Sequence, residues 1–416
     1  MKKFVTIFLL TVVAAVVQAQ IRVPVKWKIR LEDSGTPEKE IVFTATAEKG
    51  WHLYDQNLPS KGPVSTSFSF ETLKGAELDG KATPSVKPTV VYDPSFAMNV
   101  VNYLTKDPQG KEVTASGIIT YPSDKQIKGV VVSMHYTITK GDEAPSVALF
   151  TPESLLAFRG YLIISPDYIG FGSTSNLTHP YLHVENTGRI TVDMVYAVRE
   201  YLSSMNIEVK KNLIVMGYSQ GGAAALAFQK MAEEQYADDM PIDRVFAGGG
   251  PYDLVATFNE FAQTNTSAYP CSIPDILIGL NYGDNLQLDF STLFKEPLLS
   301  HYDDWYNSKN YTTGQINSMI GSNKISDFLN EKLFTLENST YVKIYNSLEK
   351  NSLTNWTPKA PIYMIHAAND HYVPYVNALN AYNAFKKKGC QVELVTTQLD
   401  HGGTAFPYAL KILQEL

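Results

Sequence analysis

The pattern of apolar and polar residues divides the chain into two parts near residue 95. In the first part, apolar and polar side chains alternate over residues 23–29, and short apolar runs follow at residues 41–45 and 67–70, separated by glycines and prolines. Alternation with a period of two residues is typical of β-strands with one buried face. We therefore predict a small all-β sandwich over residues 20–95.

In the second part, short apolar runs alternate with segments whose apolar residues recur every three to four positions. The runs predict strands and the longer spacing predicts helices. The predicted strands are residues 113–121, 129–134, 161–165, 213–216, 244–248, 361–365 and 392–395, and the predicted helices are residues 151–158, 185–202, 222–228 and 376–387. Strands that alternate with helices form a parallel sheet covered on both faces, so we predict an α/β fold for residues 96–416.

Residues 254–356 interrupt this alternation. They are rich in Asn, Ser, Thr and aromatic residues, among them Phe258, Phe261 and Tyr269. A loop of this length without secondary structure would be unusual in a compact domain. We expect a helical cap insertion that shapes an apolar pocket over the site. An insertion that only packs beside the core is the alternative.

The N-terminus has the features of a signal peptide. Two lysines follow Met1, residues 4–17 are apolar but short for a membrane span, and Ala19 fits a cleavage site. We predict a signal peptide over residues 1–19 and an exported chain, periplasmic or extracellular, without an integral membrane segment after cleavage. An uncleaved membrane anchor is the alternative.

The charge distribution argues against nucleic-acid binding. The chain carries a formal net charge of −7 and has no stripe of Lys and Arg residues. Proteins that bind nucleic acids need such a basic surface to neutralise phosphates. We therefore expect no nucleic-acid partner.

The most informative motif is the Gly-x-Ser-x-Gly pentapeptide from Gly217 to Gly221, with Ser219 at its centre. An apolar strand precedes it and a helix-forming segment follows it, which is the context of a nucleophile elbow. The sharp turn needs residues without a Cβ on both sides of the serine. We predict Ser219 as the nucleophile and Gly217 and Gly221 as the elbow glycines.

A serine nucleophile needs a general base, and the base needs an acid that orients it. Asp370 follows a predicted strand and His401 follows the last one, in the chain order of this class of site. We predict Asp370 as the acid and His401 as the base, and we expect His401 in a loop that folds over the sheet. Asp400 is a weaker candidate for the acid, because its side chain should point away from that of its neighbour.

The remaining histidines suggest no metal site. His179 and His183 are close in sequence, but no third ligand lies near them. His366 should end a strand and pack locally. The triad chemistry itself uses only protein groups, so we predict neither a metal nor another cofactor.

An acyl-transfer site also needs hydrogen-bond donors for the oxyanion. One is expected to be the backbone N–H of Gln220, which follows the nucleophile. The second should come from the loop after the strand 129–134, and Tyr136 and Thr137 are the candidates there.

From about residue 97 to 416 the chain resembles α/β-hydrolases of the secretory lipase type. The likeness rests on a His-Gly-Thr-like stretch beginning at His135 and on the run Gly160–Gly172, which reads Gly-Tyr-x-apolar-x-x-Pro-Asp-Tyr-x-Gly-x-Gly. The resemblance implies a lipase or esterase in which Asp167 and Tyr168 shape a turn beside the site. The chain departs from the pattern at Tyr136, where a glycine is expected, and this ring would narrow the acyl site.

Residues 22–95 resemble the immunoglobulin-like N-terminal domain of DsbD-type thiol:disulfide interchange proteins. The likeness rests on the segment 50–68, which begins Gly-Trp-His-Leu-Tyr-Asp-Gln-Asn-Leu-Pro. Redox members of that family use a cysteine pair, and this segment contains no cysteine. The resemblance therefore implies an accessory or binding domain whose partner is unknown, not a redox enzyme.

These observations predict a secreted serine hydrolase that cleaves carboxylic esters through an acyl-enzyme on Ser219. Its substrate would be a small-molecule, lipid or glycan ester. A serine peptidase of the same fold that releases short peptides is an alternative, for which Asp303 and Asp304 in the insertion are a hint. A non-catalytic binding protein on a hydrolase scaffold is a third interpretation.

Overall fold

The computed structural model describes residues 25–33, 39–47, 96–123, 126–331 and 339–416. The chain divides into two units, residues 1–92 and residues 93–416. In the first unit, β1 (Val25–Asp33) pairs in antiparallel register with β2 (Lys39–Ala47). The predicted strand 67–70 and the segment that resembles the DsbD-type domain lie outside the described residues.

The second unit is built on one eight-stranded sheet in the order β10-β9-β8-β7-β5-β6-β4-β3. Its strands are β3 (Ala97–Lys106), β4 (Glu112–Tyr121), β5 (Gly129–Met134), β6 (Tyr161–Pro166), β7 (Leu213–Tyr218), β8 (Ile242–Gly248), β9 (Ile362–Ala367) and β10 (Val392–Thr397). The pairs β3–β4 and β4–β6 are antiparallel, and the others are parallel. The predicted α/β fold is therefore confirmed, with β3 as an edge strand that the sequence analysis missed.

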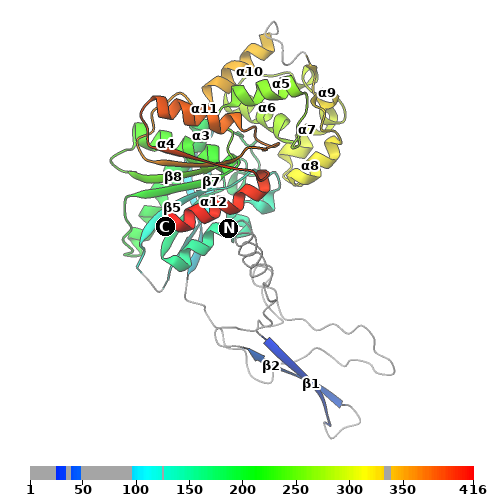
Figure 1. Ribbon diagram of the computed structural model, residues 1–416. Coiled ribbons are helices and arrows are strands. Elements are labelled where there is room, and N and C mark those ends of the chain that lie inside the picture. The colour runs from blue at the N-terminus through cyan, green and yellow to red at the C-terminus, as the bar shows by residue number, and fades with distance from the viewer. Residues whose placement is uncertain (1–24, 34–38, 48–95, 124–125, 332–338) are drawn as a thin grey trace, which may run out of the picture. The chain divides into compact units, whose positions relative to one another are not determined.

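Helices cover both faces of this sheet (Figure 1). The helices α3 (Val184–Ser204), α4 (Gln220–Gln235) and α11 (Val376–Lys387) pack on one face, and α12 (His401–Glu415) and the 3-10 helix η2 (Pro152–Arg159) pack on the other. The alternation of side chains along a strand separates the two layers. On β5, for example, Val130 and Val132 join the first layer and Val131 joins the second.

The segment between β8 and β9 folds into helices that lie at one end of the sheet (Figure 1). They are α5 (Leu254–Thr264), α6 (Ser272–Gly283), η4 (Phe290–Thr292), α7 (Leu298–Asn307), α8 (Thr313–Ile320), α9 (Ile325–Phe328) and α10 (Ser339–Lys350). We call this segment the cap. The remaining short helices are η1 (Gly141–Glu143), α2 (Pro145–Ala148) and η3 (Gly172–Thr174).

Asp284, just after α6, connects the cap to the core through hydrogen bonds. Its carboxylate accepts hydrogen bonds from His183 Nε2 at 3.2 Å, Asn351 Nδ2 at 2.9 Å, Ser347 Oγ at 2.5 Å and Lys350 Nζ at 2.5 Å. His183 belongs to the core, because it is the N-cap residue of α3. Burial alone would raise the pKa of Asp284, but the hydrogen bonds from His183, Lys350 and Ser347 outweigh it and hold the pKa below its ordinary value.

The turn between β7 and α4 is the tightest backbone packing near the site. Ser219 occupies it with φ of 59° and ψ of −125°, outside the regions that side chains prefer. A Cβ on Gly217 would lie 2.0 Å from the carbonyl oxygen of Gly221, and a Cβ on Gly221 would lie 2.1 Å from the carbonyl oxygen of Met134. Both glycines are therefore required by the close approach of β5, β7 and α4.

We expect Asp284→Asn to lower the free energy of unfolding by about 2–4 kcal/mol at pH 7, because it removes a buried charge that several donors face. The folded-state pKa is depressed, so the stabilisation is complete above the unfolded value of about 4, begins to decline below it, and is fully lost only as the pH falls through the lower folded-state pKa. Thermal denaturation at pH 7 and pH 3 measures this. Asp303→Asn, at an exposed position, is the control. An equal loss of stability in both variants, or a loss in Asp284→Asn that is as large at pH 3 as at pH 7, would contradict the stabilising role of Asp284.

We expect Gly217→Ala to lower the free energy of unfolding by more than about 3 kcal/mol or to abolish soluble expression, because backbone atoms must move to admit the methyl group. Gly314→Ala in α8 is a matched control, because a Cβ at this position would have no neighbour closer than 3.9 Å. This variant should raise the free energy of unfolding by up to about 1 kcal/mol. Soluble yield and melting temperature report both effects. A Gly217→Ala protein as stable as wild type would show that the turn is not tightly packed.

Candidate active site

Three residues that are far apart in sequence form a hydrogen-bonded chain at one end of the sheet. Ser219 follows β7, Asp370 follows β9, and His401 follows β10. His401 Nε2 lies 3.0 Å from Ser219 Oγ, and His401 Nδ1 lies 2.6 Å from Asp370 Oδ2. The structure thus brings together the three residues predicted as nucleophile, base and acid, in the geometry that acyl transfer requires.

The Asp370 carboxylate is held in place from two sides. Its Oδ1 accepts hydrogen bonds from the backbone N–H groups of Tyr372 at 2.9 Å and Val373 at 2.8 Å, which leaves Oδ2 for His401. The residue is buried, and so is His366, whose Nε2 lies 2.9 Å from Val373 O and 3.4 Å from Asp370 Oδ2. His366 therefore packs locally, as predicted, and supports the loop that carries Asp370.

His401 does not lie in a loop, which is a correction to the sequence analysis. It is the first residue of α12, and Asp400 is the N-cap residue, with Oδ1 accepting the backbone N–H of Gly403 at 2.7 Å. The pair of glycines at 402–403 suggested a loop, but an N-cap aspartate is also a helix-start signal. Asp400 thus bonds to the helix, while Asp370 bonds to the imidazole.

His179 and His183 do not converge on one site. His183 caps α3 and contacts Asp284. His179 Nδ1 lies 2.7 Å from Ile169 O, and its Nε2 lies 2.8 Å from Gln220 Nε2, so Nδ1 donates and Nε2 accepts. Burial, helped by nearby Lys309, lowers the pKa of His179 and keeps it neutral. Within the described ranges, no group of three potential ligands is placed to hold a metal ion.

The loop after β5 lies beside the serine. Gln220, Tyr136 and Thr137 are the predicted oxyanion residues; Gln220 is the first residue of α4, and the other two line the same cavity as Ser219. The first N–H groups of a helix have no partner within the helix, so that of Gln220 is available to a ligand. Thr137 Oγ1 is 2.8 Å from Tyr181 OH, and the Tyr136 side chain is 57% exposed at the rim.

His135 and the end of β6 hold this loop. The His135 ring nitrogens lie 2.7 Å from Tyr136 O and 3.1 Å from Asp167 O, and its ring stacks on Tyr168 with centroids 3.9 Å apart. Tyr168 OH donates to His135 O at 3.1 Å. Asp167 in turn accepts hydrogen bonds from Ser116 Oγ and the backbone N–H of Ser146. The Pro-Asp-Tyr run in the sequence was the signal for this support.

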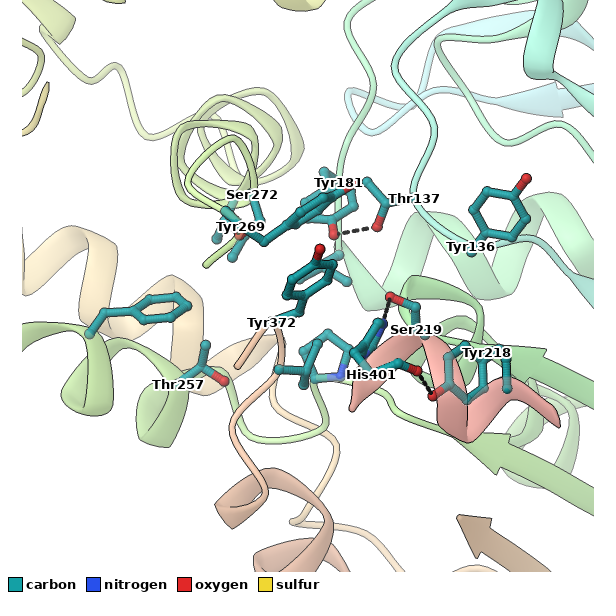
Figure 2. Close-up of a pocket in the computed structure, with 17 residues that line it drawn as sticks. Tyr136, Thr137, Tyr181, Tyr218, Ser219, Thr257, Tyr269, Ser272, Tyr372 and His401 are labelled. Carbon is teal, nitrogen blue, oxygen red and sulfur yellow. Dashed lines mark hydrogen bonds between the residues drawn. The ribbon is translucent and has the colours of Figure 1, made fainter. Parts of the chain in front are cut away.

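Ser219 and His401 open into a cavity of about 240 Å³ between the sheet and the cap. Figure 2 shows the cap residues Thr257, Tyr269 and Ser272 away from Ser219, while Thr137, Tyr181 and Tyr372, which belong to loops of the core, complete the lining. Aromatic rings dominate the lining: Tyr136, Tyr181, Tyr218, Phe261, Tyr269 and Tyr372. The cap contribution was not predictable residue by residue, because Thr257, Phe261 and Ile276 face the cavity only once α5 and α6 are packed.

The cavity lining has no acidic side chain and no lysine or arginine. Burial raises the pKa of Tyr181, Tyr218 and Tyr269, so their hydroxyls stay protonated. Such a site suits an uncharged substrate, since a charged group would lose its hydration without gaining a partner.

The comparisons with known proteins agree with this geometry. Residues 150–406 match the family described as Secretory lipase. A secreted triacylglycerol lipase of Malassezia furfur is 23% identical over 319 residues, which are 71% of this chain and 57% of that protein. A second one, from Malassezia globosa, is 22% identical over 397 residues, which are 88% and 76% of the two chains. The chain thus spans little more than half the length of the first relative.

Solved structures share the fold. The rice cell wall degrading esterase LipA from Xanthomonas oryzae superposes with a TM-score of 0.66 at 23% identity, over 76% of this chain and 87% of that one. Candida antarctica lipase A superposes with a TM-score of 0.59 at 17% identity, over 74% of each chain. These likenesses support the predicted α/β-hydrolase fold.

The family match includes Ser219, Asp370 and His401 and extends over more than half of the chain. Among the described residues, no helix is long and apolar enough to cross a membrane. On this match and this fold, the chain belongs to the secretory lipase family.

Proposed function

We propose that this protein is a secreted serine hydrolase that cleaves carboxylic esters. The observation that carries the proposal is the hydrogen-bonded chain from Ser219 Oγ through His401 to Asp370, which opens into a neutral, aromatic cavity. The relatives are named secreted triacylglycerol lipases, and the structural neighbours include a named esterase. These names support ester hydrolysis and export for this chain.

In the acylation step, Ser219 Oγ attacks the ester carbonyl carbon while His401 Nε2 accepts the hydroxyl proton. Asp370 holds the Nδ1–H of His401 and stabilises the imidazolium that forms. The oxyanion receives hydrogen bonds from the backbone N–H of Gln220 and from that of Tyr136 or Thr137. When the tetrahedral intermediate collapses, His401 returns the proton to the departing alcohol.

Deacylation repeats these steps with water as the nucleophile. His401 takes a proton from the water as it attacks the acyl carbon, and then protonates Ser219 Oγ as the acid product leaves. The proton transfers between Ser219 Oγ and His401 Nε2 use two atoms that are already within hydrogen-bond distance, at 3.0 Å. The reaction needs no group beyond those of the chain and water.

The cavity favours an ester over a short peptide. Binding the free amine of a peptide requires a carboxylate in the pocket, and the lining has none. Asp303 and Asp304, the earlier hint of a peptidase, are exposed on α7 and bond to Asn307 and Tyr311. They contribute nothing to the lining.

For the N-terminal part, we propose removal of residues 1–19 on export, an immunoglobulin-like accessory domain over residues 20–95, and a catalytic domain over residues 96–416. The likeness of residues 50–68 to DsbD-type domains supports the accessory domain, and so does the antiparallel pairing of β1 with β2. Without cysteines this domain has no redox chemistry of its own. Its role is therefore binding or support.

We expect Ser219→Ala to reduce the kcat for p-nitrophenyl butyrate by at least about 10⁴-fold and to abolish labelling by a fluorophosphonate probe. Ser318→Ala, an exposed serine of α8, is the control and should keep both. The same preparations are offered alanine p-nitroanilide. Labelling that survives in Ser219→Ala, or wild-type turnover of the anilide that exceeds that of the ester, would contradict the proposal.

A pair of conservative variants distinguishes between Asp370 and Asp400 as the acid that orients His401. Asp370→Asn keeps the shape of the side chain but leaves His401 without an anionic partner, so kcat should fall by about 10⁴-fold. Asp400→Asn retains a good N-cap residue for α12, and its kcat should stay within a few-fold of wild type. Steady-state kinetics with p-nitrophenyl butyrate measure both. The reverse order of effects would assign the acid to Asp400.

A further inference from the structure

We propose that the cavity is a short acyl chamber, open to solvent beside the exposed rings of Tyr136 and Tyr372 and ending at α5, that limits the acyl chain of the ester to about eight carbons. This inference rests on the proposed function and concerns the substrate class of that same site. The cavity volume is about 240 Å³, below the range of about 300–1,000 Å³ that is usual for ligand pockets. A water molecule in the liquid occupies about 30 Å³, and a methylene group is of similar size, so about eight such groups fill the chamber.

The chamber ends at α5. Thr257 lies across the cavity from Ser219 (Figure 2), and Phe261 is one helical turn further along α5, on the same face. Both residues line the cavity and both are 3% exposed. A chain that starts at the acyl carbon on Ser219 therefore meets a closed wall, not an exit.

This end wall is anchored to the core. Asn377 of α11 is fully buried and donates from Nδ2 to Thr257 Oγ1 at 2.8 Å. Its Oδ1 accepts the backbone N–H of Asp253 at 2.9 Å, and Asp253 is the N-cap residue of α5. Asn380 adds a hydrogen bond to the Asp253 carboxylate at 2.8 Å. Moving α5 away would break several buried hydrogen bonds at once, so the wall is fixed.

Aromatic stacking closes the side of the chamber next to the catalytic residues. Tyr269 of the cap and Tyr372 of the acid loop stack with ring centroids 4.7 Å apart and an angle of 16°. The Tyr372 ring also lies 5.3 Å from that of His401 (Figure 2). Tyr181 lies beside Tyr269 in Figure 2, and its hydroxyl group hydrogen-bonds to that of Thr137 in the loop after β5.

These walls predict a specific chain-length profile. Each methylene group that enters the apolar chamber should raise kcat/KM by up to about fourfold. A sixteen-carbon chain needs about 480 Å³, roughly twice the available space, so its distal half must stay outside or force the walls apart. The methylene groups that stay outside add no binding free energy, and a chain that does not fit positions its ester carbonyl poorly at Ser219.

The test is a series of p-nitrophenyl esters with acyl chains of two to sixteen carbons, presented to the full mature protein in one constant detergent. The expected kcat/KM rises to a maximum at six to eight carbons and falls at least tenfold at twelve and sixteen. A value at sixteen carbons that equals or exceeds the value at eight overturns the chain-length limit and leaves ester hydrolysis intact. Absence of turnover with every ester overturns the proposed function, and the limit with it.

A variant tests which residue sets the limit. Phe261→Ala should raise the ratio of kcat/KM at twelve carbons to that at six by at least fivefold, because it lengthens the chamber. Phe328→Ala is the matched control: it also truncates a buried phenylalanine of the cap, but one outside the lining, and should leave the ratio unchanged. The ratio does not depend on how much enzyme is folded. An unchanged ratio in Phe261→Ala would show that α5 is not the end wall.

Discussion

The site depends on the close contact between the end of β7 and the first turn of α4. The absence of a Cβ at Gly217 and Gly221 lets the backbones approach, and this approach holds Ser219 at a positive φ. In this turn Ser219 Oγ lies 3.0 Å from His401 Nε2, and Gln220, the first residue of α4, follows directly. The proposed nucleophile and the proposed oxyanion donor thus depend on one backbone arrangement.

Parallel strands bring those remaining groups together. The carboxyl ends of β7, β9 and β10 lie at the same edge of the sheet, so residues that follow each strand meet although they are up to 182 positions apart. The cap then covers this edge, and a buried carboxylate at Asp284 fastens it to the start of α3. The arrangement of the proposed triad therefore comes from the sheet, while the cap contributes part of the cavity lining.

The parts that could be predicted from sequence are those with a strong local signal. The central strands are continuous apolar runs, and Ser219 and Asp370 each follow one of them, while His401 follows the edge strand β10. The edge strand β3 was missed because its exposed face carries the apolar residues Met98, Val100 and Leu104, so apolar and polar residues do not alternate in its sequence. Helix α12 was missed because Gly402 and Gly403 resemble a loop. The cavity lining could not be predicted, because it combines residues from many separate segments whose meeting depends on how α5 and α6 pack.

The hydrogen bonds between Thr257 and Asn377 connect the proposed end wall of the chamber to the helix that follows the Asp370 loop. Asn377 lies at the start of α11, directly after the loop that carries Asp370, so the proposed end wall of the chamber and the proposed acid share one structural support. A change on the α11 side would disturb turnover as well as selectivity. Divergence of substrate preference within this architecture should therefore proceed through the cap residues that have no partner in α11, where the shape of the chamber can evolve without cost to the triad.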